Sequence, residues 1–359
     1  MVPQMNVPLA PLSTLGVGGA AKWLTRAQQT RDVADAHAWC ADRGVPMFVL
    51  GGGSNLVIAD EGFGGLVLHI ALRGTDLVVD GEEMLVTSRA GEPWDDVVAA
   101  VVARGFAGLE CLSGIPGSVG GTPIQNVGAY GQEVAGSIER VTVFDRTGGA
   151  TAMLAPRECG FSYRMSRFKA DDTGRYVVCE VAFRVRRGSP TTTYPDVAAH
   201  LHRSGVSSPS VADVRDAVLA IRRQKGMVVD ARDPDTRSVG SFFVNPIVTE
   251  DARETIASIA GEAAPEFSMG GGRVKIPAAW LIERSGFTKG YRAGAVGIST
   301  KHPLAIVTRA GATSRDVVRM AGRIKRAVAD RFGVWLMPEP IFVGFGDEAE
   351  VDYVKQAGP

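Results

Sequence analysis

Residues 113–131 read Ser-Gly-Ile-Pro-Gly-Ser-Val-Gly-Gly-Thr-Pro-Ile-Gln-Asn-Val-Gly-Ala-Tyr-Gly. Six of these 19 residues are glycine, so several backbone N–H groups can approach one anion without an intervening Cβ. Hydroxyl, amide and phenol side chains alternate with the glycines. Because a simple turn needs only one or two glycines, the length and polarity of this loop predict a cradle for a large phosphorylated cofactor.

A second glycine cluster supports this interpretation. Gly51-Gly52-Gly53-Ser54-Asn55 follows the apolar run 46–50, which is typical of a strand, and backbone donors at a strand end often hold a phosphate. No Gly-Lys-Ser/Thr follows either cluster, so neither is a Walker loop. Residues 55–58 continue as a strand rather than a helix, which excludes the dinucleotide fingerprint. Each loop alone is also compatible with an ordinary turn, but together they suggest a diphosphate held from two sides.

The composition limits the possible partners. The chain has 359 residues, of which 45% are hydrophobic and 22% charged, as in globular proteins. Its 39 basic and 39 acidic residues cancel, so no overall charge favours nucleic acid or an anionic membrane. Residues 1–10 lack the features of a signal peptide, and no apolar run approaches the ~18 residues of a membrane span. We therefore expect a cytoplasmic protein without a nucleic-acid or membrane partner.

Cysteines and histidines give no sign of a metal site. The four cysteines include no Cys-x-x-Cys pair, which favours reduced, buried thiols: Cys40, Cys111, Cys159 and Cys179. None of the five histidines forms a helical metal pair with a carboxylate. His200 and His202 would diverge on a helix because they are two residues apart. We expect no metal ion.

Apolar spacing, caps and turns predict an α+β protein in three pieces. Helices are expected at residues 31–43, 93–104, 211–225, 249–261, 277–285 and 314–332. Strands are expected at 21–27, 46–50, 65–70, 76–79, 84–89, 138–145, 150–154, 177–186, 241–245, 296–298 and 304–307. The first helix and its flanking strands form a predicted β-α-β unit. Residues 227–237 are polar, contain Asp233-Pro234-Asp235, and are expected to form a hinge into the third piece.

Three further motifs place polar residues among apolar and aromatic neighbours. They are Gly-Phe-Ser-Tyr-Arg-Met-Ser-Arg-Phe at 160–168, Gly-Ser-Phe-Phe-Val-Asn-Pro at 240–246 and Leu-Met-Pro-Glu-Pro at 336–340. Burying such polar groups in a core is costly, whereas placing them beside a bound ligand is reasonable. These segments are therefore candidates for chemistry.

The three motifs and the two glycine loops occur in order over nearly the whole chain, from about Leu9 to Gly344, and resemble the UDP-N-acetylenolpyruvoylglucosamine reductase family. These flavoenzymes of peptidoglycan precursor synthesis are also called UDP-N-acetylmuramate dehydrogenases. The resemblance implies a two-part FAD-binding domain of the vanillyl-alcohol-oxidase (PCMH) type and a separate α+β substrate-binding domain. The expected boundaries are 1–75, with 343–359 returning to this first flavin subdomain, then 76–226 for the second and 227–342 for the substrate domain. Because Gly51–Asn55 lacks the histidine often used for covalent attachment, FAD is expected to be bound non-covalently.

The resemblance also implies a reaction in two halves. NADPH delivers a hydride to flavin N5, and the reduced flavin passes it to C3 of the enolpyruvyl ether of UDP-N-acetylglucosamine, giving UDP-N-acetylmuramate after protonation at C2. By motif position, Ser241 would supply that proton, Arg164 would hold the substrate carboxylate, and Glu339 would complete the enolate site. Without the resemblance, Ser241 would be taken as a turn or helix cap, Arg164 as half of a surface ion pair and Glu339 as a solvated loop charge.

The same resemblance assigns binding residues. For the substrate they are Tyr194, of the family branch with a tyrosine loop, Lys225, Asn245 and His302. For FAD they are Gly51, Gly52, Gly53, Ser54, Asn55, Ser113, Gly117, Gly120, Gly121, Gln125, Asn126, Gly128, Ala129 and Tyr130. The chain departs from some relatives in a longer stretch between Lys225 and Ser241, which contains Asp233-Pro234-Asp235.

Two alternative functions remain open at this point. A flavin oxidase of the same superfamily, acting on an alcohol or sugar, would use oxygen and would not need the Gly-Ser-Phe-Phe motif. A catalytically inactive sensor of UDP-sugars would not need Arg164, Ser241 and Glu339 together. No segment suggests self-association, so a monomer is expected.

Overall fold

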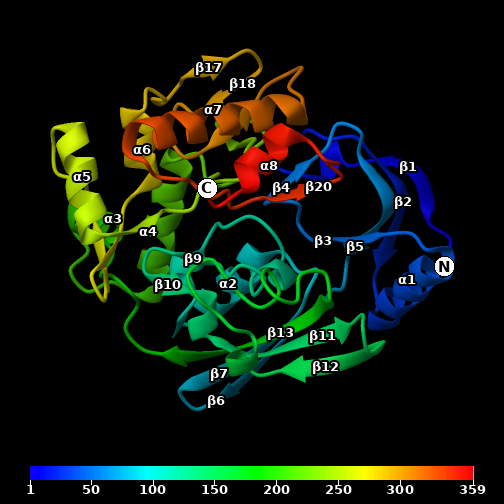
Figure 1. The fold of residues 1–359 in the computed structure, drawn as a ribbon. Helices are drawn as coiled ribbons and strands as arrows, with labels where there is room; N and C mark the ends of the chain where they lie inside the picture. Colours follow the sequence, from blue (N-terminus) through cyan, green and yellow to red (C-terminus); the bar gives the residue numbers. More distant parts are fainter. Residues whose placement is uncertain (359) are drawn as a thin grey trace. The chain divides into compact units, whose positions relative to one another are not determined.

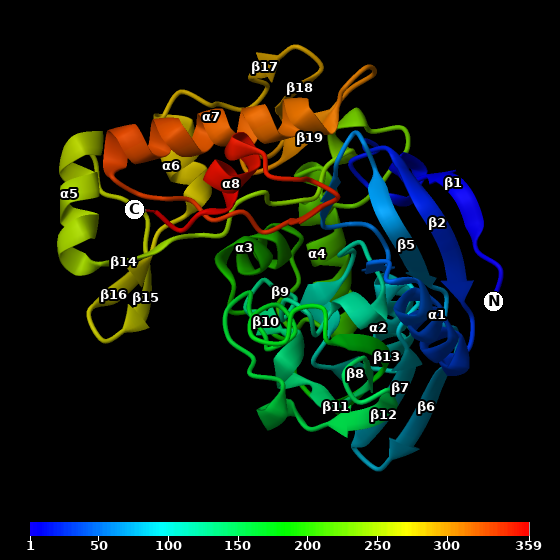
Figure 2. The ribbon, with the colours of Figure 1, turned by 45° about the vertical axis from the view of Figure 1, so that its right-hand side comes forward.

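The computed structural model describes residues 1–358, and Figures 1 and 2 show the ribbon from two directions. Contacts divide the chain into two compact units. Unit 1 comprises residues 1–7, 21–53 and 64–228, and unit 2 comprises 8–20, 54–63 and Val229 onward. Both units combine helices with sheets, which confirms the expected α+β class.

The first sheet of unit 1 has the order β1-β2-β5-β3: β1 (Gln4–Pro8), β2 (Ala20–Ala27), β5 (Phe63–Ile70) and β3 (Met47–Leu50). Helix α1 (Thr30–Arg43) connects β2 to β3, as predicted, but β5 lies between these strands and pairs with β3 in parallel. The α1 helix begins where the Asp32 carboxylate accepts the backbone N–H groups of Gln28 and Gln29, both at 2.8 Å. It ends at Gly44, whose φ is +61°. The sheet thereby places residues 51–53 immediately after β3.

The second sheet of unit 1 is antiparallel and has the order β12-β11-β13-β7-β6, with β8 on β13: β6 (Thr75–Asp80), β7 (Glu83–Arg89), β8 (Phe106–Ala107), β11 (Ile138–Asp145), β12 (Ala150–Leu154) and β13 (Tyr176–Arg187). Helix α2 (Trp94–Val102) packs in the same core, where the ring of Trp94 lies 5.5 Å from that of Phe183. Val98 and Val101 are fully buried, and burial of each such side chain contributes about 1.5–3 kcal/mol. The glycine-rich loop 113–131 follows this helix and contains the strand β9 (Gly128–Ala129), which pairs with β10 (Gln132–Glu133).

Two further helices of unit 1 pack together, α3 (Pro195–Arg203) and α4 (Val211–Gln224). Tyr194 is the residue immediately before α3, and Lys225 is the residue immediately after α4. Ser210 caps α4 by accepting the backbone N–H of Asp213, as its position in the sequence predicted. The helix ends thus bring two predicted substrate residues to one part of unit 1.

Unit 2 contains the strands β4 (Leu56–Ile58), β14 (Ile247–Thr249), β15 (Phe267–Gly270), β16 (Arg273–Lys275), β17 (Arg292–Ala293), β18 (Val296–Ile298), β19 (Ile306–Thr308) and β20 (Ile341–Val343). They form two antiparallel sheets, β14-β16-β15 and β17-β18-β19, and one parallel pair, β4-β20. The helices are α5 (Glu250–Ala260), α6 (Ala278–Arg284), α7 (Ser314–Phe332) and α8 (Ala349–Lys355). Figure 2 shows α7 extending beside α8.

The last helix is fastened to α7 by a buried lysine. Lys325 of α7 is fully buried, and its Nζ donates to the backbone oxygens of Val354, at 2.8 Å, and Gln356, at 2.5 Å. The carbonyls at the end of α8 thus receive donors from a cation, which also suits the negative end of the helix dipole.

One local prediction is wrong. Residues 241–245 form no regular strand, because only Phe243 pairs, in a single bridge with Pro338. Residues 227–237 contain the last of the five points where the chain passes between the units. Within this segment Asp235 is 3% exposed and its carboxylate is bonded to Arg309 at 2.5 Å, so that residue is fixed in unit 2, and a hinge at residues 227–237 stays a prediction.

The contacts also divide the chain differently from the expected domain boundaries. Residues 8–20 and 54–63 belong to unit 2, and so does the C-terminal helix α8, which was expected to return to the first flavin subdomain. The functional division into two flavin subdomains and a substrate domain stays a prediction. Over residues 1–358, we find no helix with the length and hydrophobicity needed to cross a bilayer.

Candidate active site

The two glycine-rich loops lie against each other in unit 1. A Cβ on Gly52 would lie 2.6 Å from the Cα of Gly117, and one on Gly51 would lie 2.8 Å from the Oγ of Ser118. Residues with side chains could not approach so closely. Gly117 also has a φ of +126°, which favours glycine independently. The loop after β3 and the loop after α2 therefore pack directly against each other, and their joint role as a cofactor cradle stays a prediction.

Backbone donors are concentrated where these loops meet. Within residues 1–358, the N–H groups of Gly51, Gly52, Gly117 and Ser118 donate no hydrogen bond to another protein group. Backbone N–H groups are rarely left without an acceptor unless solvent or a ligand supplies one. Several such donors on adjoining glycine-rich loops suit a phosphate group. The residues present therefore fit the diphosphate of FAD.

Two of the predicted cofactor residues are used within the protein instead. The hydroxyl of buried Ser113 donates to the carbonyl of Glu110 at 2.6 Å. The N–H of Gly120 donates to the carbonyl of Ala90 at 2.8 Å, and a Cβ there would lie 2.7 Å from that of Ala90. Gly120 thus permits close packing of the loop on the strand end. Neither group is available to a ligand in this conformation.

Other loop positions leave space. A Cβ on Gly121 would meet no atom within 4 Å, and Gln125 and Ala129 are half-buried. Gly53 has a φ of +64°, which explains the glycine there by backbone conformation alone.

Asn126 holds the loop that carries Arg164. The Asn126 side chain is 1% exposed and donates from Nδ2 to Glu133 Oε2 at 2.8 Å and to the carbonyl of Ser162 at 3.0 Å. Its Oδ1 accepts the N–H of Ala135 at 3.1 Å. Since all of these groups are satisfied within the protein, Asn126 connects two site segments rather than offering its side chain to a cofactor.

Arg164 is held at a tight turn. Ser162 and Met165 exchange backbone hydrogen bonds of 3.0 and 3.1 Å across it. The Nη2 of Arg164 donates to the carbonyl of Gly128 at 2.6 Å, and the guanidinium lies 5.3 Å from the ring centre of Tyr163. This contact orients a planar cation beside the second glycine loop.

Backbone strain is concentrated at the same place. Among residues 1–358, four residues other than glycine have positive φ: Asn6, Asn126, Tyr130 and Arg164. Three of these were predicted site residues. Such conformations cost of order 1–3 kcal/mol and cluster at functional sites, where the surrounding structure over-determines them.

A group of aromatic and charged side chains surrounds the ends of α3 and α4. The rings of Tyr130 and Tyr194 meet edge to face at 5.3 Å. Lys225 Nζ lies 5.9 Å from the ring centre of Tyr130 and 2.6 Å from Asp196 Oδ2. Burial raises the pKa of both tyrosines, so both remain neutral donors at physiological pH. A pocket of about 430 Å³, lined in part by Asp196 and Lys225, opens between the two helices.

Arg222 belongs to this group although sequence analysis did not assign it a site role. Its Nη2 donates to the carbonyl of Met227 at 2.8 Å, and its guanidinium interacts electrostatically with Tyr130. Burial lowers the pKa of the guanidinium, and its Nε has no hydrogen-bond partner among the described residues. In the sequence Arg222 looks like one of several basic residues at a helix end. Its spacing of three residues from Lys225 is the one signal that both share a helix face.

In unit 2, three distant segments meet around Ser241. The N–H of Phe242 donates to the carbonyl of Leu304, and the N–H of Glu339 donates to the carbonyl of Phe242, both at 2.9 Å. The rings of Phe242 and Phe243 are buried and anchor this segment. Ser241 is partly exposed, and over residues 1–358 its hydroxyl makes no hydrogen bond to another protein group. The structure thus places the segment that carries Ser241 beside the segment that carries Glu339.

Two predicted substrate residues have fixed hydrogen-bond directions. Asn245 Oδ1 accepts the N–H of Ala278 at 2.9 Å and so caps α6, which leaves its Nδ2 as the donor. His302 Nδ1 accepts the N–H of Leu304 at 3.1 Å.

Ser54 and Asn55 also belong to unit 2. The Asn55 side chain donates to the carbonyl of Glu339 at 3.3 Å, and its own carbonyl accepts the N–H of Ile341 at 3.0 Å. The carbonyl of Ser54 accepts the hydroxyl of Thr14 at 3.4 Å. Asn55 therefore supports the Glu339 segment, and its contact with FAD stays a prediction.

Comparison with known proteins gives matches to both units. Residues 21–152 match the FAD binding domain, and residues 233–343 match the C-terminal domain of UDP-N-acetylenolpyruvoylglucosamine reductase. The reductase of that name from Thermobifida fusca is 48% identical, with 94% of this chain and 97% of the relative covered. The one from Streptomyces coelicolor is 47% identical, with 94% and 90% covered. The crystal structure of the Thermus caldophilus reductase superposes with a TM-score of 0.65 at 26% identity, covering 96% of this chain and 99% of that one.

The fold, the paired glycine loops and these matches first define a class, that of the FAD-binding oxidoreductases. Within that class, the chain belongs to the UDP-N-acetylenolpyruvoylglucosamine reductase family.

Proposed function

We propose that this protein uses NADPH and non-covalently bound FAD to reduce the enolpyruvyl ether of UDP-N-acetylglucosamine to UDP-N-acetylmuramate, a step of peptidoglycan precursor synthesis. The observation that carries this proposal is identity of 48% to a reductase of that name over 94% of the chain. The FAD-binding match and the glycine cradle of unit 1 account for the cofactor.

The predicted cofactor residues would position FAD and compensate the negative charge of its diphosphate. Bound FAD would accept a hydride from NADPH and deliver it to the substrate. Gly51, Gly52, Gly117 and Ser118 would hold its diphosphate through backbone N–H groups that have no protein acceptor in the described chain. Because these donors are preformed, little reorganisation is needed when the anion binds.

Arg164 would bind the substrate carboxylate. Hydride addition to an unsaturated carboxylate increases the negative charge on that group, and a fixed guanidinium stabilises the charge as it develops. The hydrogen bond from Arg164 to the Gly128 carbonyl and the strained backbone at Arg164 support this positioning role.

Ser241 would donate the proton to C2, with Glu339 beside it. A serine hydroxyl is a weak acid, but a carbanion-like carbon is a strong base, so transfer is favourable where water is excluded. The backbone hydrogen bond between Glu339 and Phe242, the residue after Ser241, supports the joint action of Ser241 and Glu339 on one substrate.

The remaining residues would bind the nucleotide sugar. Lys225 and Tyr194 offer one cation and one neutral phenol, which suit a diphosphate, while Tyr130, predicted to contact FAD, packs edge to face against Tyr194. Asn245 offers an N–H donor, and so does His302 when its imidazole is neutral. We further propose that the protein is cytoplasmic, because the four cysteines are free and buried and because NADPH and nucleotide sugars are cytoplasmic metabolites. We also propose a monomer, as expected from a sequence in which no segment suggests self-association.

The decisive experiment measures NADPH consumption by FAD-loaded protein with the enolpyruvyl nucleotide sugar. UDP-N-acetylglucosamine, which lacks the enolpyruvyl group, is the matched control. We expect rapid NADPH oxidation with the first compound alone and a product heavier by two hydrogens in the mass spectrum. Equal rates with both compounds would disprove the proposal, and oxygen-dependent turnover of an alcohol or sugar would favour the oxidase alternative.

A further inference from the structure

The Asp233-Pro234-Asp235 segment is clamped to the loop that carries His302. Asp235 is 3% exposed. Its Oδ2 accepts the hydroxyl and the N–H of Thr300, at 2.5 and 2.9 Å, and the hydroxyl of Ser299, at 3.2 Å. Its Oδ1 accepts Nη2 of Arg309 at 2.5 Å. A single buried carboxylate thus joins two loops that are distant in the sequence.

The charge of Asp235 fixes the direction of these hydrogen bonds. Burial alone would raise its pKa, but the donors from Thr300, Arg309 and Ser299 outweigh that effect, and the pKa is lowered. An ionised carboxylate only accepts. The Ser299 hydroxyl must therefore donate to Asp235, which leaves its own oxygen free to accept from other groups.

Ser299 passes this constraint on to His302. The Ser299 Oγ accepts the N–H of Lys301 at 3.0 Å and that of His302 at 3.3 Å. The His302 Nδ1 then accepts the N–H of Leu304 at 3.1 Å. Because a ring nitrogen that accepts carries no proton, the neutral imidazole of His302 holds its hydrogen on Nε2.

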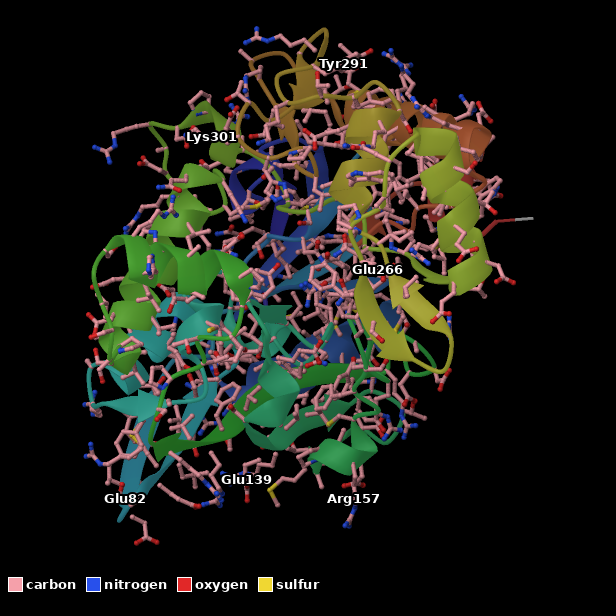
Figure 3. All side chains as sticks on the ribbon, turned by 90° about the vertical axis from the view of Figure 1, so that its left-hand side faces the viewer. Glu82, Glu139, Arg157, Glu266, Tyr291 and Lys301 are labelled. Carbon is pink, nitrogen blue, oxygen red and sulfur yellow. The ribbon has the colours of Figure 1, made fainter. Side chains whose placement is uncertain are left out.

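A second contact closes the clamp from the outside. Lys301, labelled in Figure 3, donates from Nζ to Asp233 Oδ2 at 2.5 Å. Unlike Asp235, the Lys301–Asp233 ion pair is partly exposed to solvent. It therefore contributes less to stability than a buried ion pair would. The two aspartates of one motif therefore provide a natural comparison, since Asp235 is connected to Ser299 and Asp233 is not.

We propose that Asp235 is a positioning residue for substrate binding, which acts through Ser299 to hold His302 so that its Nε2–H is presented to the nucleotide sugar. The inference rests on the proposed function, in which His302 binds the substrate. It gives the Asp-Pro-Asp stretch a role in substrate affinity rather than in connecting the two units.

Steady-state kinetics of the FAD-loaded enzyme test this role. Asp235→Asn replaces an acceptor with a donor opposite Ser299 and Thr300, so we expect the KM for the enolpyruvyl sugar to rise about tenfold with kcat changed less than about twofold. The matched control Asp233→Asn should leave KM within about twofold. His302→Ala should raise KM like Asp235→Asn, and His302→Gln, which keeps an N–H donor, should restore most of the affinity.

A double-mutant cycle separates this route from general destabilisation. If Asp235 acts through His302, then Asp235→Asn combined with His302→Ala should be no worse than His302→Ala alone. The inference would be overturned if the KM of the double variant rose by the product of the two single effects, or if His302→Ala had a normal KM. If Asp235→Asn does not fold, Ser299→Ala carries the same test with a smaller change.

A measurement without turnover distinguishes failure of the clamp from failure of the proposed function. Correlations between ring nitrogens and ring protons in NMR spectra identify the histidine tautomer, and His302→Gln assigns the signal among the five histidines. We expect the proton on Nε2 in the wild type and a mixture of tautomers in Asp235→Asn. A wild-type ring protonated on Nδ1 would overturn the clamp, whatever reaction the enzyme catalyses.

Discussion

The backbone N–H of Glu339 donates a 2.9 Å hydrogen bond to the carbonyl of Phe242, the residue that follows Ser241. The segment that carries the proposed proton donor, Ser241, is therefore joined to the segment of Glu339 by a hydrogen bond between backbone atoms. Side-chain substitutions at Ser241 or Glu339 leave this bond in place. Their effects on turnover should consequently report on chemistry more than on folding.

Ser241→Ala should separate the two half-reactions. Flavin reduction by NADPH should remain within about twofold of the wild type, because no proton from Ser241 is needed there. Oxidation of the reduced enzyme by the enolpyruvyl sugar should slow by about 100-fold or more, as expected for loss of a general acid. Stopped-flow flavin absorbance measures both steps. Equal slowing of both would show that Ser241 is not the proton donor, and Ser285→Ala, whose hydroxyl bonds to Leu281 in α6, is the control.

Arg164→Lys should strongly reduce kcat/KM for the substrate. Lysine keeps the charge but not the planar fork that binds a carboxylate through two hydrogen bonds, each worth about 1.5–3 kcal/mol when charged groups are involved. We expect a loss of about 10- to 100-fold in steady-state assays. Arg167→Lys is the matched control, because Arg167 lies on the same loop but is paired with Asp172. Similar losses in both variants would contradict a specific role for Arg164.

Gly52→Ala should weaken FAD binding. The new Cβ would lie 2.6 Å from Gly117 Cα, and because the Cβ position is fixed by the Gly52 backbone and Gly117 Cα is itself a backbone atom, one loop must move. We expect the dissociation constant for FAD to rise at least tenfold in fluorescence titrations. The control is Gly136→Ala, because a Cβ on Gly136 would have no atom within 4 Å, and this variant should bind FAD with unchanged affinity. An unchanged affinity of Gly52→Ala for FAD would show that the contact between the two loops is not needed for cofactor binding.

Lys325 should make stability depend on pH in the alkaline range. Burial lowers its pKa from 10.5 to about 8. Between these values the unfolded chain binds more protons than the folded protein at this residue, so its contribution to the free energy of unfolding rises as the pH increases from about 8 to 10.5. Below pH 8 both states are protonated, and the cost of burying the charge is fully present.

Urea unfolding of the wild type and Lys325→Met, compared at pH 7 and pH 10, measures this contribution. The difference in unfolding free energy between them should shift in favour of the wild type at the higher pH. A difference that does not change with pH would show that Lys325 is not desolvated in the folded state.

Most helices and strands could be predicted from the sequence, because apolar spacing, helix caps and turn residues depend on neighbouring residues alone. The strands 138–145 and 150–154 and the helix 314–332 were predicted with the observed bounds. Caps such as Ser210 and stops such as Gly44 depend on neighbouring residues alone. The same reasoning predicted both glycine loops.

Long-range features were missed because no local pattern encodes them. Residues 241–245 look like a strand from their apolar run, but their neighbours come from two different segments, so no ladder forms. The burial of Arg222 depends on the packing of α4 beside Tyr130, which the basic run at the helix end conceals. Asp235 was likewise interpreted as part of a hinge because its partners Ser299 and Thr300 lie more than 60 residues away.

The parallel pairing of β4 with β20 has a consequence for biosynthesis. Residues 56–58 are synthesised long before their partner strand, 341–343, because the two strands lie far apart in the sequence. Unit 2 therefore cannot be completed until β20 has been synthesised, and closing so long a loop slows folding. We expect truncations that remove β20 to be degraded rather than merely inactive, because they leave β4 without its partner strand.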